Sequence, residues 1–350
     1  MFKRILVCGA GAIGGTIAAF LARCGHPVTV VDLVAEHVAR IRQVGLAITG
    51  PVAEFTVRMN ALTPSDLRGE FDLVLLAVKA QHTRVAVEMI KSHLAVHGTV
   101  VSVQNGLNEY LIAELVGPER TLGCFVHFGA DYEAPGHIAY HIRMPLMLGE
   151  LDGRMTERLR AVHTLLQEFE PNAEMTDNIF GFLWSKLVFS AMMIAQALVK
   201  VPTQEFLDDR SYRPLIYRMV GEVARVAAAE GVRLMPFQGF EAGAFIDGDE
   251  SAMDAAVSEY ARRRRGSKKM FMGVYRDLFI RHRVSEVSPW YAPVLRLAER
   301  HNIGVPALTT GVKAIASIES GRTSLSNDLA AEVAALLHGA ATVQDVQVLQ

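Results

Sequence analysis

Three glycines near the start of the chain, Gly9, Gly11 and Gly14, follow the spacing Gly-x-Gly-x-x-Gly. The apolar residues 5–8 before them are typical of a strand buried on both faces, and the small apolar residues 16–23 after them are typical of a helix. A strand, a glycine turn and a helix in this order can hold a diphosphate on the free amides of the helix N-terminus. The pattern therefore predicts a site for a dinucleotide.

Each glycine has a predicted task, and an acid further along the chain has another. Gly9 permits the tight turn, Gly11 lets the diphosphate approach the backbone, and Gly14 lets the helix pack on the strand. Asp32 stands 18 residues after Gly14, at the end of the next apolar run, residues 28–31. Its carboxylate can accept hydrogen bonds from the ribose of NAD and would repel the 2′-phosphate of NADP. We expect NAD or NADP as cofactor, with NAD favoured, unless Asp32 only caps the following helix.

Two polar residues, Lys79 and Asn105, stand where two further predicted strands, residues 73–78 and 99–103, come to an end. In open α/β sheets the ligand binds outside the carboxyl ends of the strands. We therefore expect both side chains to contact the cofactor, although either could be an ordinary loop residue.

The predicted strands of the first half alternate with helices at residues 16–23 and 33–44, which indicates a parallel sheet built from right-handed crossovers. From Asp152 onward the strand signals stop, and apolar residues recur at helical spacing. The predicted helices cover residues 184–199, 212–230, 250–265, 289–301, 306–317 and 326–338. The polar stretch 176–178 marks the boundary, so we predict an α/β Rossmann domain over residues 1–177 and an all-α domain over residues 178–350.

Lys186 lies inside the most apolar of these helices, where a buried ammonium is costly unless it is paired or faces a cleft. Its head could extend to the surface. We favour the alternative, in which Lys186 donates a proton to a carbonyl oxygen while a hydride adds to the carbon. Glu286 stands just before another predicted helix, and capping alone could explain it.

The formal net charge is −2 and the isoelectric point is about 6.6, which argues against nucleic acid as the main partner. One basic run covers residues 262–265 and is followed by Lys268 and Lys269. It is typical of a solvated helix end, although it could also steer an anionic ligand.

The three cysteines, Cys8, Cys24 and Cys124, lack the spacing of a disulfide framework or a zinc site, and we expect them to be buried in a protein of a reducing compartment. The histidines show no metal-ligand spacing either, so we expect no metal. The chain starts directly with a strand, and its richest apolar stretch, residues 187–199, is too short to cross a bilayer. We therefore expect a cytoplasmic protein without membrane contact.

Several segments together resemble the ketopantoate reductase family, whose members are 2-dehydropantoate 2-reductases. The segments are residues 9–15, 77–80, 103–107, 184–187, 197–202, 285–287 and 303–306. Such enzymes join a Rossmann domain to an all-helical domain like that of 6-phosphogluconate dehydrogenase, with the active site in the cleft between the two. The resemblance spans nearly the whole chain.

The resemblance implies a role for each candidate residue. Lys186 would be the general acid and Glu286 would help to hold cofactor and substrate together, so these two are the predicted catalytic residues. The predicted cofactor-binding residues are Gly9, Gly11, Ala12, Ile13, Gly14, Asp32, Lys79, Asn105, Ala130 and Glu286. The predicted substrate-binding residues are Lys79, Asn105, Lys186 and Ser190.

The chain departs from the family pattern where the substrate should bind. Asparagines usually stand one and two turns after the catalytic lysine, but here Ser190 takes the first place and Met193 or Ile194 the second. The serine that usually precedes the glutamate falls in residues 271–274, Phe-Met-Gly-Val, which carry no hydroxyl. Each polar group of ketopantoate left unpaired in such a pocket would cost about 1–3 kcal/mol. We therefore expect a divergent pocket that prefers a larger or more apolar substrate.

These observations predict an oxidoreductase that transfers a hydride between a nicotinamide cofactor and a 2-oxo acid or 2-hydroxy acid, either 2-dehydropantoate or a more apolar analogue. The alternatives are an NAD-dependent D-2-hydroxyacid dehydrogenase of the same family, a dehydrogenase acting on a C–N bond, and a dinucleotide-binding protein without catalysis. The expected partners are a small carboxylate substrate and, because the second half is rich in apolar helices, a second copy of the chain in a homodimer.

Overall fold

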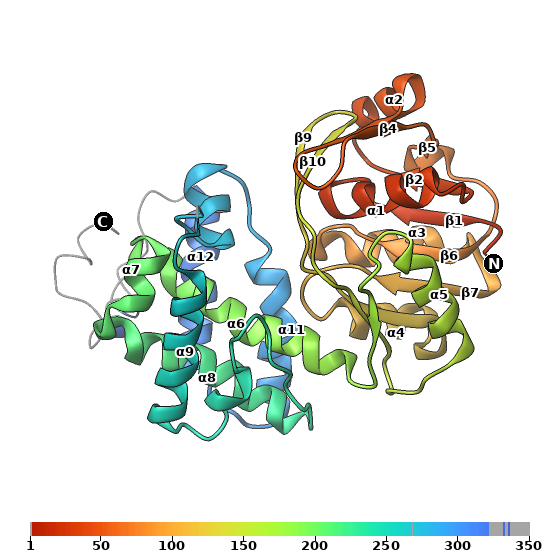
Figure 1. Cartoon of the computed structure of the whole chain (residues 1–350). Coiled ribbons are helices and arrows are strands. Elements are labelled where there is room, and N and C mark those ends of the chain that lie inside the picture. Colours follow the sequence, from red (N-terminus) through yellow and green to blue (C-terminus); the bar gives the residue numbers. More distant parts are fainter. Residues whose placement is uncertain (1, 268, 322–331, 333–334, 337–350) are drawn as a thin grey trace. The chain divides into compact units, whose positions relative to one another are not determined.

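The computed structural model describes residues 2–267, 269–321, 332, 335 and 336 (Figure 1). The chain divides into two compact units, Met1–Ile179 and Phe180–Gln350, and the division falls two residues after the predicted boundary. The predicted helix over residues 326–338 lies almost entirely outside the described residues, and Lys268 lies outside them.

An eight-stranded sheet forms the centre of the first unit (Figure 1). Its strands stand in the order β12-β11-β8-β7-β6-β1-β2-β5, and neighbours pair in parallel except for β8 with β11. The strands are β1 (Ile5–Cys8), β2 (Val28–Val31), β5 (Asn60–Leu62), β6 (Phe71–Leu76), β7 (Leu94–Ser102), β8 (Thr121–Phe125), β11 (Met147–Glu150) and β12 (Glu174–Met175). This arrangement confirms the predicted Rossmann domain. The expectation that strands stop at Asp152 is wrong, because β12 adds an edge strand beyond it.

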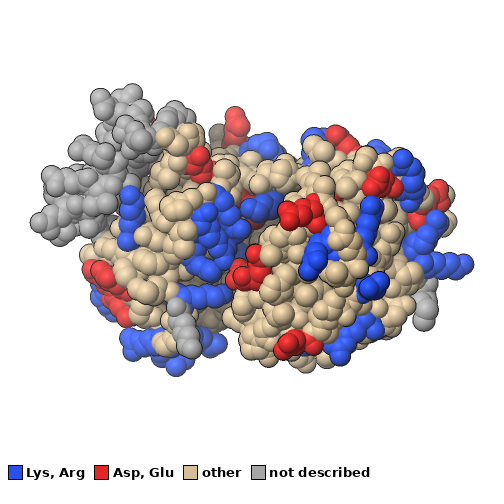
Figure 2. Space-filling model, turned by 90° about the horizontal axis from the view of Figure 1, so that it is seen from above, with Lys and Arg blue, Asp and Glu red and all other residues tan. Residues whose placement is uncertain are grey.

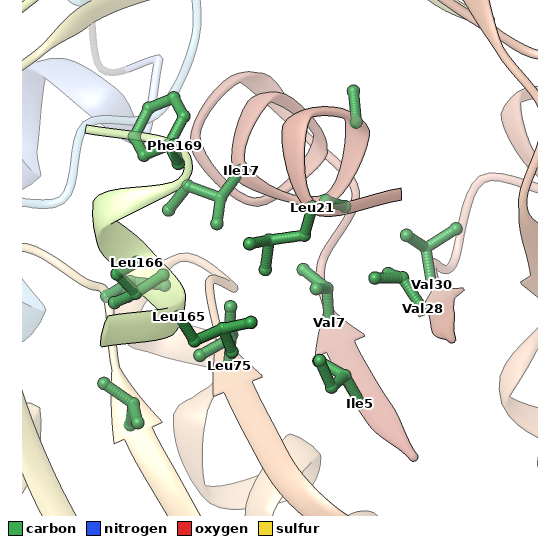
Figure 3. Close-up of a cluster of buried hydrophobic side chains, with 14 of the residues drawn as sticks. Ile5, Val7, Ile17, Leu21, Val28, Val30, Leu75, Leu165, Leu166 and Phe169 are labelled. Carbon is green, nitrogen blue, oxygen red and sulfur yellow. The ribbon is translucent and has the colours of Figure 1, made fainter. Parts of the chain in front are cut away.

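The helices of this unit are α1 (Ala12–Arg23), α2 (Ala35–Val44), α3 (Thr83–Lys91), α4 (Asn108–Val116) and α5 (Glu157–Gln167). Successive residues of β1 point to opposite faces of the sheet, so Ile5 and Val7 join one apolar cluster while Leu6 and Cys8 join another. Figure 3 shows the first cluster, in which side chains of α1 and α5 cover the sheet. Burial on both faces explains why the central strands are continuous apolar runs.

The sequence does not predict the second sheet of this unit, which has the strand order β4-β3-β10-β9. Its strands are β3 (Leu46–Thr49), β4 (Phe55–Val57), β9 (Gly129–Ala134) and β10 (His137–Ile142). Phe20 of α1 makes edge-to-face contacts with Phe55 and Tyr140 of this sheet, at ring-centroid distances of 5.1 and 5.8 Å. The second sheet therefore packs against the helix that follows the glycine turn.

The second unit is helical, as predicted. Its helices are α6 (Ile179–Val199), α7 (Thr203–Asp208), α8 (Arg213–Ala229), α9 (Glu250–Arg264), α10 (Gly273–Tyr275), α11 (Val287–Arg300) and α12 (Pro306–Glu319). Within its described residues, the extended pairing is limited to an isolated bridge between Phe237 and Phe240. The all-α prediction is confirmed for this part of the chain.

Two sequence-based expectations need correction. The apolar stretch 187–199, expected to be too short to cross a bilayer, belongs to the longer helix α6 of 21 residues. By length and composition α6 could cross a bilayer, although 83% of its most apolar window is buried within the protein. Such burial is typical of a core helix. The cysteines are not all buried, because Cys24 at the end of α1 is exposed, whereas Cys8 and Cys124 are buried.

Glu109, in the first turn of α4, is fully buried, and its carboxylate oxygens have no hydrogen-bond partner of normal geometry among the described residues. Burial raises the pKa of Glu109 from 4.5 to about 7, although the nearby Ser102 hydroxyl lowers it in part. The folded protein therefore binds this proton more tightly than the unfolded chain does. Its stability falls as the pH rises from about 4.5 to about 7, and the full penalty applies above that range.

Replacing this carboxyl by an amide of the same shape, Glu109→Gln, should remove the penalty. We expect the free energy of unfolding to rise by up to about 3 kcal/mol at pH 8 and by much less at pH 5. Urea unfolding at both pH values measures the effect, with the exposed Glu119→Gln as a control that should show no such pH dependence. An equal change at pH 5 and pH 8 would contradict the assignment.

Candidate functional site

The glycine turn lies between β1 and α1, against the end of β6, and its geometry places a different constraint on each glycine. Gly9 has a φ of 94°, and a Cβ there would lie 2.9 Å from the Ala77 carbonyl carbon. A Cβ on Gly14 would lie 2.0 Å from the Gly9 oxygen and 2.7 Å from the Ala77 Cβ. At Gly11, by contrast, no described heavy atom outside the adjoining backbone and the two neighbouring residues lies within 4 Å of the Cβ position. Packing therefore requires Gly9 and Gly14, whereas Gly11 borders open space.

Open space at Gly11 fits the diphosphate of a dinucleotide. Gly11 is the N-cap residue of α1, no side-chain hydrogen bond caps the helix there, and Ala12 and Ile13 begin its first turn. The exposed amides and the positive end of the helix dipole would attract a phosphate. The predicted contact residue Ala130 lies on β9 and packs against the apolar cluster that contains Ala10.

Asp32 follows β2 and is half-buried. Its Oδ2 accepts a hydrogen bond from Ala10 N at 2.8 Å, and its Oδ1 accepts one from Val34 N at 2.9 Å. Val34 is the N-cap residue of α2, and its own side chain makes no capping hydrogen bond. The task of Asp32 is therefore not capping alone, because its carboxylate is fixed beside the glycine turn. Each oxygen keeps a lone pair that a ribose hydroxyl could use.

Lys79 and Asn105 follow the paired parallel strands β6 and β7, and both are half-buried. Side chains that the sequence analysis did not single out join these two strand ends. Gln104 Nε2 donates to the Val78 carbonyl oxygen at 2.7 Å and to Thr83 Oγ1 at 2.8 Å. The backbone just before Lys79 is thereby fixed from the end of β7.

The same network continues to Asn105. The Thr83 hydroxyl donates to Asn108 Oδ1 at 3.0 Å, and Asn108 Nδ2 donates to the Asn105 carbonyl oxygen at 2.8 Å. Gln104, Thr83 and Asn108 are all buried, so these bonds are shielded from water. The sequence signal that could have found the network is a glutamine placed directly after a buried strand.

In the helical unit, Lys186, Ser190 and Met193 are spaced four and three residues apart on α6 and share one face. Lys186 and Met193 are half-buried, whereas every other residue from 183 to 199 is buried. The least buried face of this stretch therefore carries the predicted lysine. The Ser190 hydroxyl donates to the Lys186 carbonyl oxygen at 2.7 Å, so Ser190 would offer a substrate only its lone pairs.

Glu286 is the N-cap residue of α11, but its side chain makes no capping hydrogen bond, so capping alone does not explain it. Ser285 anchors this segment, because its N–H donates to Glu319 Oε1 at 2.8 Å. The Tyr291 hydroxyl of α11 donates to the Leu187 carbonyl oxygen of α6 at 2.8 Å. The helix that Glu286 precedes is thereby tied to the helix that carries the predicted general acid.

Met193, one of the two candidates for the second lost asparagine, lies beside Gly273, which belongs to the stretch without the family serine. A Cβ on Gly273 would lie 3.8 Å from Met193 Sδ. On either side of Gly273 in the sequence, Phe271 and Tyr275 stack at a ring-centroid distance of 4.0 Å. A π-helix, Arg276–Ile280, follows directly, and such irregular turns are frequent at functional sites. The stretch that lacks the family serine thus carries two stacked rings and lies beside Met193.

The basic run at the end of α9 is paired with acids. Arg262 and Arg263 contact Glu259 at 2.8 and 2.6 Å, and Arg265 lies 3.6 Å from Asp208. Hydrogen bonds from the two neighbouring arginines lower the pKa of Glu259 to about 2. Figure 2 shows lysine and arginine side chains interspersed with acidic ones on the face that it presents. These contacts favour a solvated helix end over a patch that steers an anionic ligand.

The chain is similar to known proteins over most of its length. The family model described as ketopantoate reductase PanE/ApbA matches residues 5–153, and the model of its C-terminal part matches residues 178–319. A 2-dehydropantoate 2-reductase of Streptococcus pyogenes serotype M3 is 24% identical over 304 residues, 86% of this chain and 93% of that protein. The enzyme of the same name from Pyrococcus horikoshii is 29% identical over 234 residues, which cover 66% of this chain and 75% of that protein.

Solved structures show the same two-domain fold. A PanE/ApbA family ketopantoate reductase from Ralstonia eutropha JMP134 superposes with a TM-score of 0.76 at 25% identity, covering 91% of this chain and 99% of that one. A D-mandelate dehydrogenase with NADH and anilino(oxo)acetate superposes with a TM-score of 0.77 at 21% identity and the same coverage, which shows a shared fold. With both of its halves matched by the family models, the chain belongs to the ketopantoate reductase family.

Proposed function

We propose that this protein uses a nicotinamide dinucleotide to reduce the keto group of a 2-oxo acid, or to oxidise the corresponding 2-hydroxy acid. The observation that carries the proposal is the glycine turn, in which Gly11 borders open space near the fixed carboxylate of Asp32. Membership of the ketopantoate reductase family supports the same activity. NAD is the favoured form, because Asp32 would repel a 2′-phosphate.

The side chains of the protein would deliver the proton, orient the reactants and line the site. When bound, the reduced nicotinamide supplies a hydride to the carbonyl carbon. Lys186 would hold a proton at Nζ and deliver it to the carbonyl oxygen, so that the keto group becomes a hydroxyl. Glu286 would orient the lysine or the substrate, and Lys79 and Asn105 would line the site from the ends of β6 and β7.

The substrate we propose is a 2-oxo acid with a side chain more apolar than that of 2-dehydropantoate. The positions of the lost asparagine and serine fall at Met193 or Ile194 and in residues 271–274. Met193 lies beside Gly273, and Phe271 and Tyr275 stack on each other nearby in the sequence. This favours the alternative of an NAD-dependent D-2-hydroxyacid dehydrogenase of the same family over strict 2-dehydropantoate reduction. The homodimer and the cytoplasmic location stay predictions.

The proposed reaction predicts turnover of NADH with 2-oxo acids and its loss in Lys186→Ala. We expect the highest kcat/KM with acids that carry branched or aromatic side chains, and a lower value with 2-dehydropantoate. Removing the general acid should lower kcat by about 10²–10⁴-fold and leave the Kd for NADH unchanged. Absorbance at the nicotinamide band and calorimetry measure the two quantities, with the exposed Lys313→Ala on α12 as control.

A protein that binds NADH but turns over no 2-oxo acid in the panel would contradict the proposed activity. That result would favour a dinucleotide-binding protein without catalysis. Turnover that survives in Lys186→Ala at the wild-type rate would instead contradict the assignment of the general acid.

The position of Asp32 predicts at least tenfold tighter binding of NADH than of NADPH. Asp32→Asn keeps the size of the side chain and an oxygen that can accept from Ala10 N, but it removes the charge that repels a 2′-phosphate. The ratio of the two Kd values should therefore move toward one. Titration calorimetry with both cofactors tests this, with Asp152→Asn on an exposed loop as control. An unchanged ratio would show that Asp32 does not select the cofactor.

We expect the same substitution, glycine to alanine, to affect stability at Gly14 and cofactor affinity at Gly11. Gly14→Ala should destabilise the fold strongly, because the new methyl would lie 2.0 Å from the Gly9 oxygen. Gly11→Ala should leave the melting temperature nearly unchanged and raise the Kd for NADH, because its methyl enters the open space. Calorimetric melting and NADH titration of both variants check the pair. Wild-type affinity in Gly11→Ala would place the diphosphate elsewhere.

A further inference from the structure

His37 is a fully buried histidine of α2 that the proposed reaction does not use. Its Nδ1 lies 2.8 Å from the Gly136 backbone nitrogen, and its Nε2 lies 2.9 Å from the Ala10 carbonyl oxygen. A backbone N–H can only donate and a carbonyl oxygen can only accept, so the ring proton must be on Nε2. His37 is therefore a neutral ring that accepts from Gly136 and donates to the glycine turn.

Ala10 stands in the middle of the glycine turn and is held on both sides. Its N–H donates to Asp32, and its carbonyl oxygen accepts from His37. That carbonyl belongs to the trans peptide bond between Ala10 and Gly11, in which C=O and N–H point in opposite directions. The hydrogen bond from His37 therefore sets the direction of the Gly11 amide, at the position that borders open space.

The other side of the imidazole is held by the second sheet. Gly136 forms the turn between β9 and β10 with a φ of 75°, and a Cβ there would lie 2.4 Å from Arg40 Cγ of α2. On β9, the ring of Tyr132 lies edge-on to His37 with centroids 5.1 Å apart. The orientation of the imidazole is thus fixed by an amide, a ring and its own burial. The second sheet, which the glycine motif does not predict, thus fixes the side chain that bonds to the glycine turn.

We propose that His37 is a positioning residue for the dinucleotide, which aims the Gly11 amide at the diphosphate by holding the Ala10 carbonyl. The inference rests on the proposed function, since it requires the glycine turn to bind a dinucleotide. A histidine that only filled the core would affect stability and would have no selective effect on cofactor affinity.

Two substitutions of His37 and one matched control test the proposal. His37→Leu removes both hydrogen bonds, whereas His37→Gln keeps one donor and one acceptor on its amide. We expect the Kd for NADH to rise about tenfold in His37→Leu, with KM for NADH rising more than kcat falls, and to stay within about threefold of the wild type in His37→Gln. The control is His163→Leu, because His163 Nε2 contacts the Ala173 carbonyl oxygen at 2.8 Å away from the glycine turn.

The outcomes separate this proposal from the proposed function. If the wild type binds NADH and His37→Leu binds it equally well, or if His163→Leu loses the same affinity, His37 does not position the cofactor. Equal losses in His37→Leu and His37→Gln would also overturn the proposal, since the hydrogen bonds would then be irrelevant. If the wild type binds neither NADH nor NADPH, the proposed function fails and this inference falls with it.

A measurement on the wild type keeps the test decisive if His37→Leu does not fold. Coupling between two sites is reciprocal, so a cofactor that relies on His37 must also strengthen the bond from Gly136 to it. We expect NADH to slow hydrogen exchange at the Gly136 amide more than at the Gly153 amide, which donates to Glu150 in a turn of the same unit. Equal slowing at both amides, or none at Gly136, would overturn the proposal.

Discussion

The close approach of the glycine turn to the end of β6 is the constraint on which the first unit depends. Helix α1 can begin directly behind β1 only because Gly14 has no side chain to meet the Gly9 oxygen and Ala77. The N-terminal amides of α1 are thereby brought to the edge where the parallel strands β6 and β7 also end. The same edge carries Lys79 and Asn105, so a single packing requirement brings the candidate diphosphate site and two further candidate residues to one edge of the sheet.

Hydrogen bonds of polar side chains then fix the details that packing leaves open. Gln104 and Asn108 join the ends of β6 and β7, while Asp32 and His37 hold the two sides of Ala10. In both cases the partner on the candidate segment is a backbone atom, which no substitution there removes except proline at position 10. In the helical unit the Tyr291 hydroxyl has the same kind of partner on α6. His37, Gln104 and Asn108 thus support candidate site residues from positions outside the proposed ligand contacts, whereas Asp32 is itself a candidate ribose contact.

The sequence predicts the elements whose signal is local. The central strands are continuous apolar runs because both of their faces are covered, and the helices of the second unit show their spacing clearly. Helix α1 begins at Ala12, earlier than residues 16–23, because glycines in its first turn hide the helical pattern. The second sheet escapes prediction because its strands are short and partly exposed, and because β3 pairs with β10 from a distant part of the chain. Met193 and residues 271–274 depart from the family pattern, but only the structure shows that Met193 and Gly273 are neighbours.

The sequence does not predict the roles of His37 and Gln104, in part because they bond to backbone atoms, which leave no mark in a sequence pattern. Neither belongs to a spacing rule, and a histidine or glutamine among apolar residues carries no sign of what it bonds. Lys186 and Glu286 are different, since a lysine in an apolar helix and an acid before a helix are unusual enough to draw attention. Their placement on half-buried positions of the helical unit agrees with that signal, while their chemical roles rest on the proposed function.

The uneven burial of the cysteines gives the protein a single convenient point for labelling. Burial raises the pKa of Cys8 to about 12, and Cys124 is buried as well, so neither thiol would react readily with a maleimide. Cys24 is exposed at the far end of α1, roughly 18 Å along the helix from the glycine turn. A fluorophore attached there would sit close enough to exchange energy with a bound reduced nicotinamide and far enough away to leave the turn undisturbed.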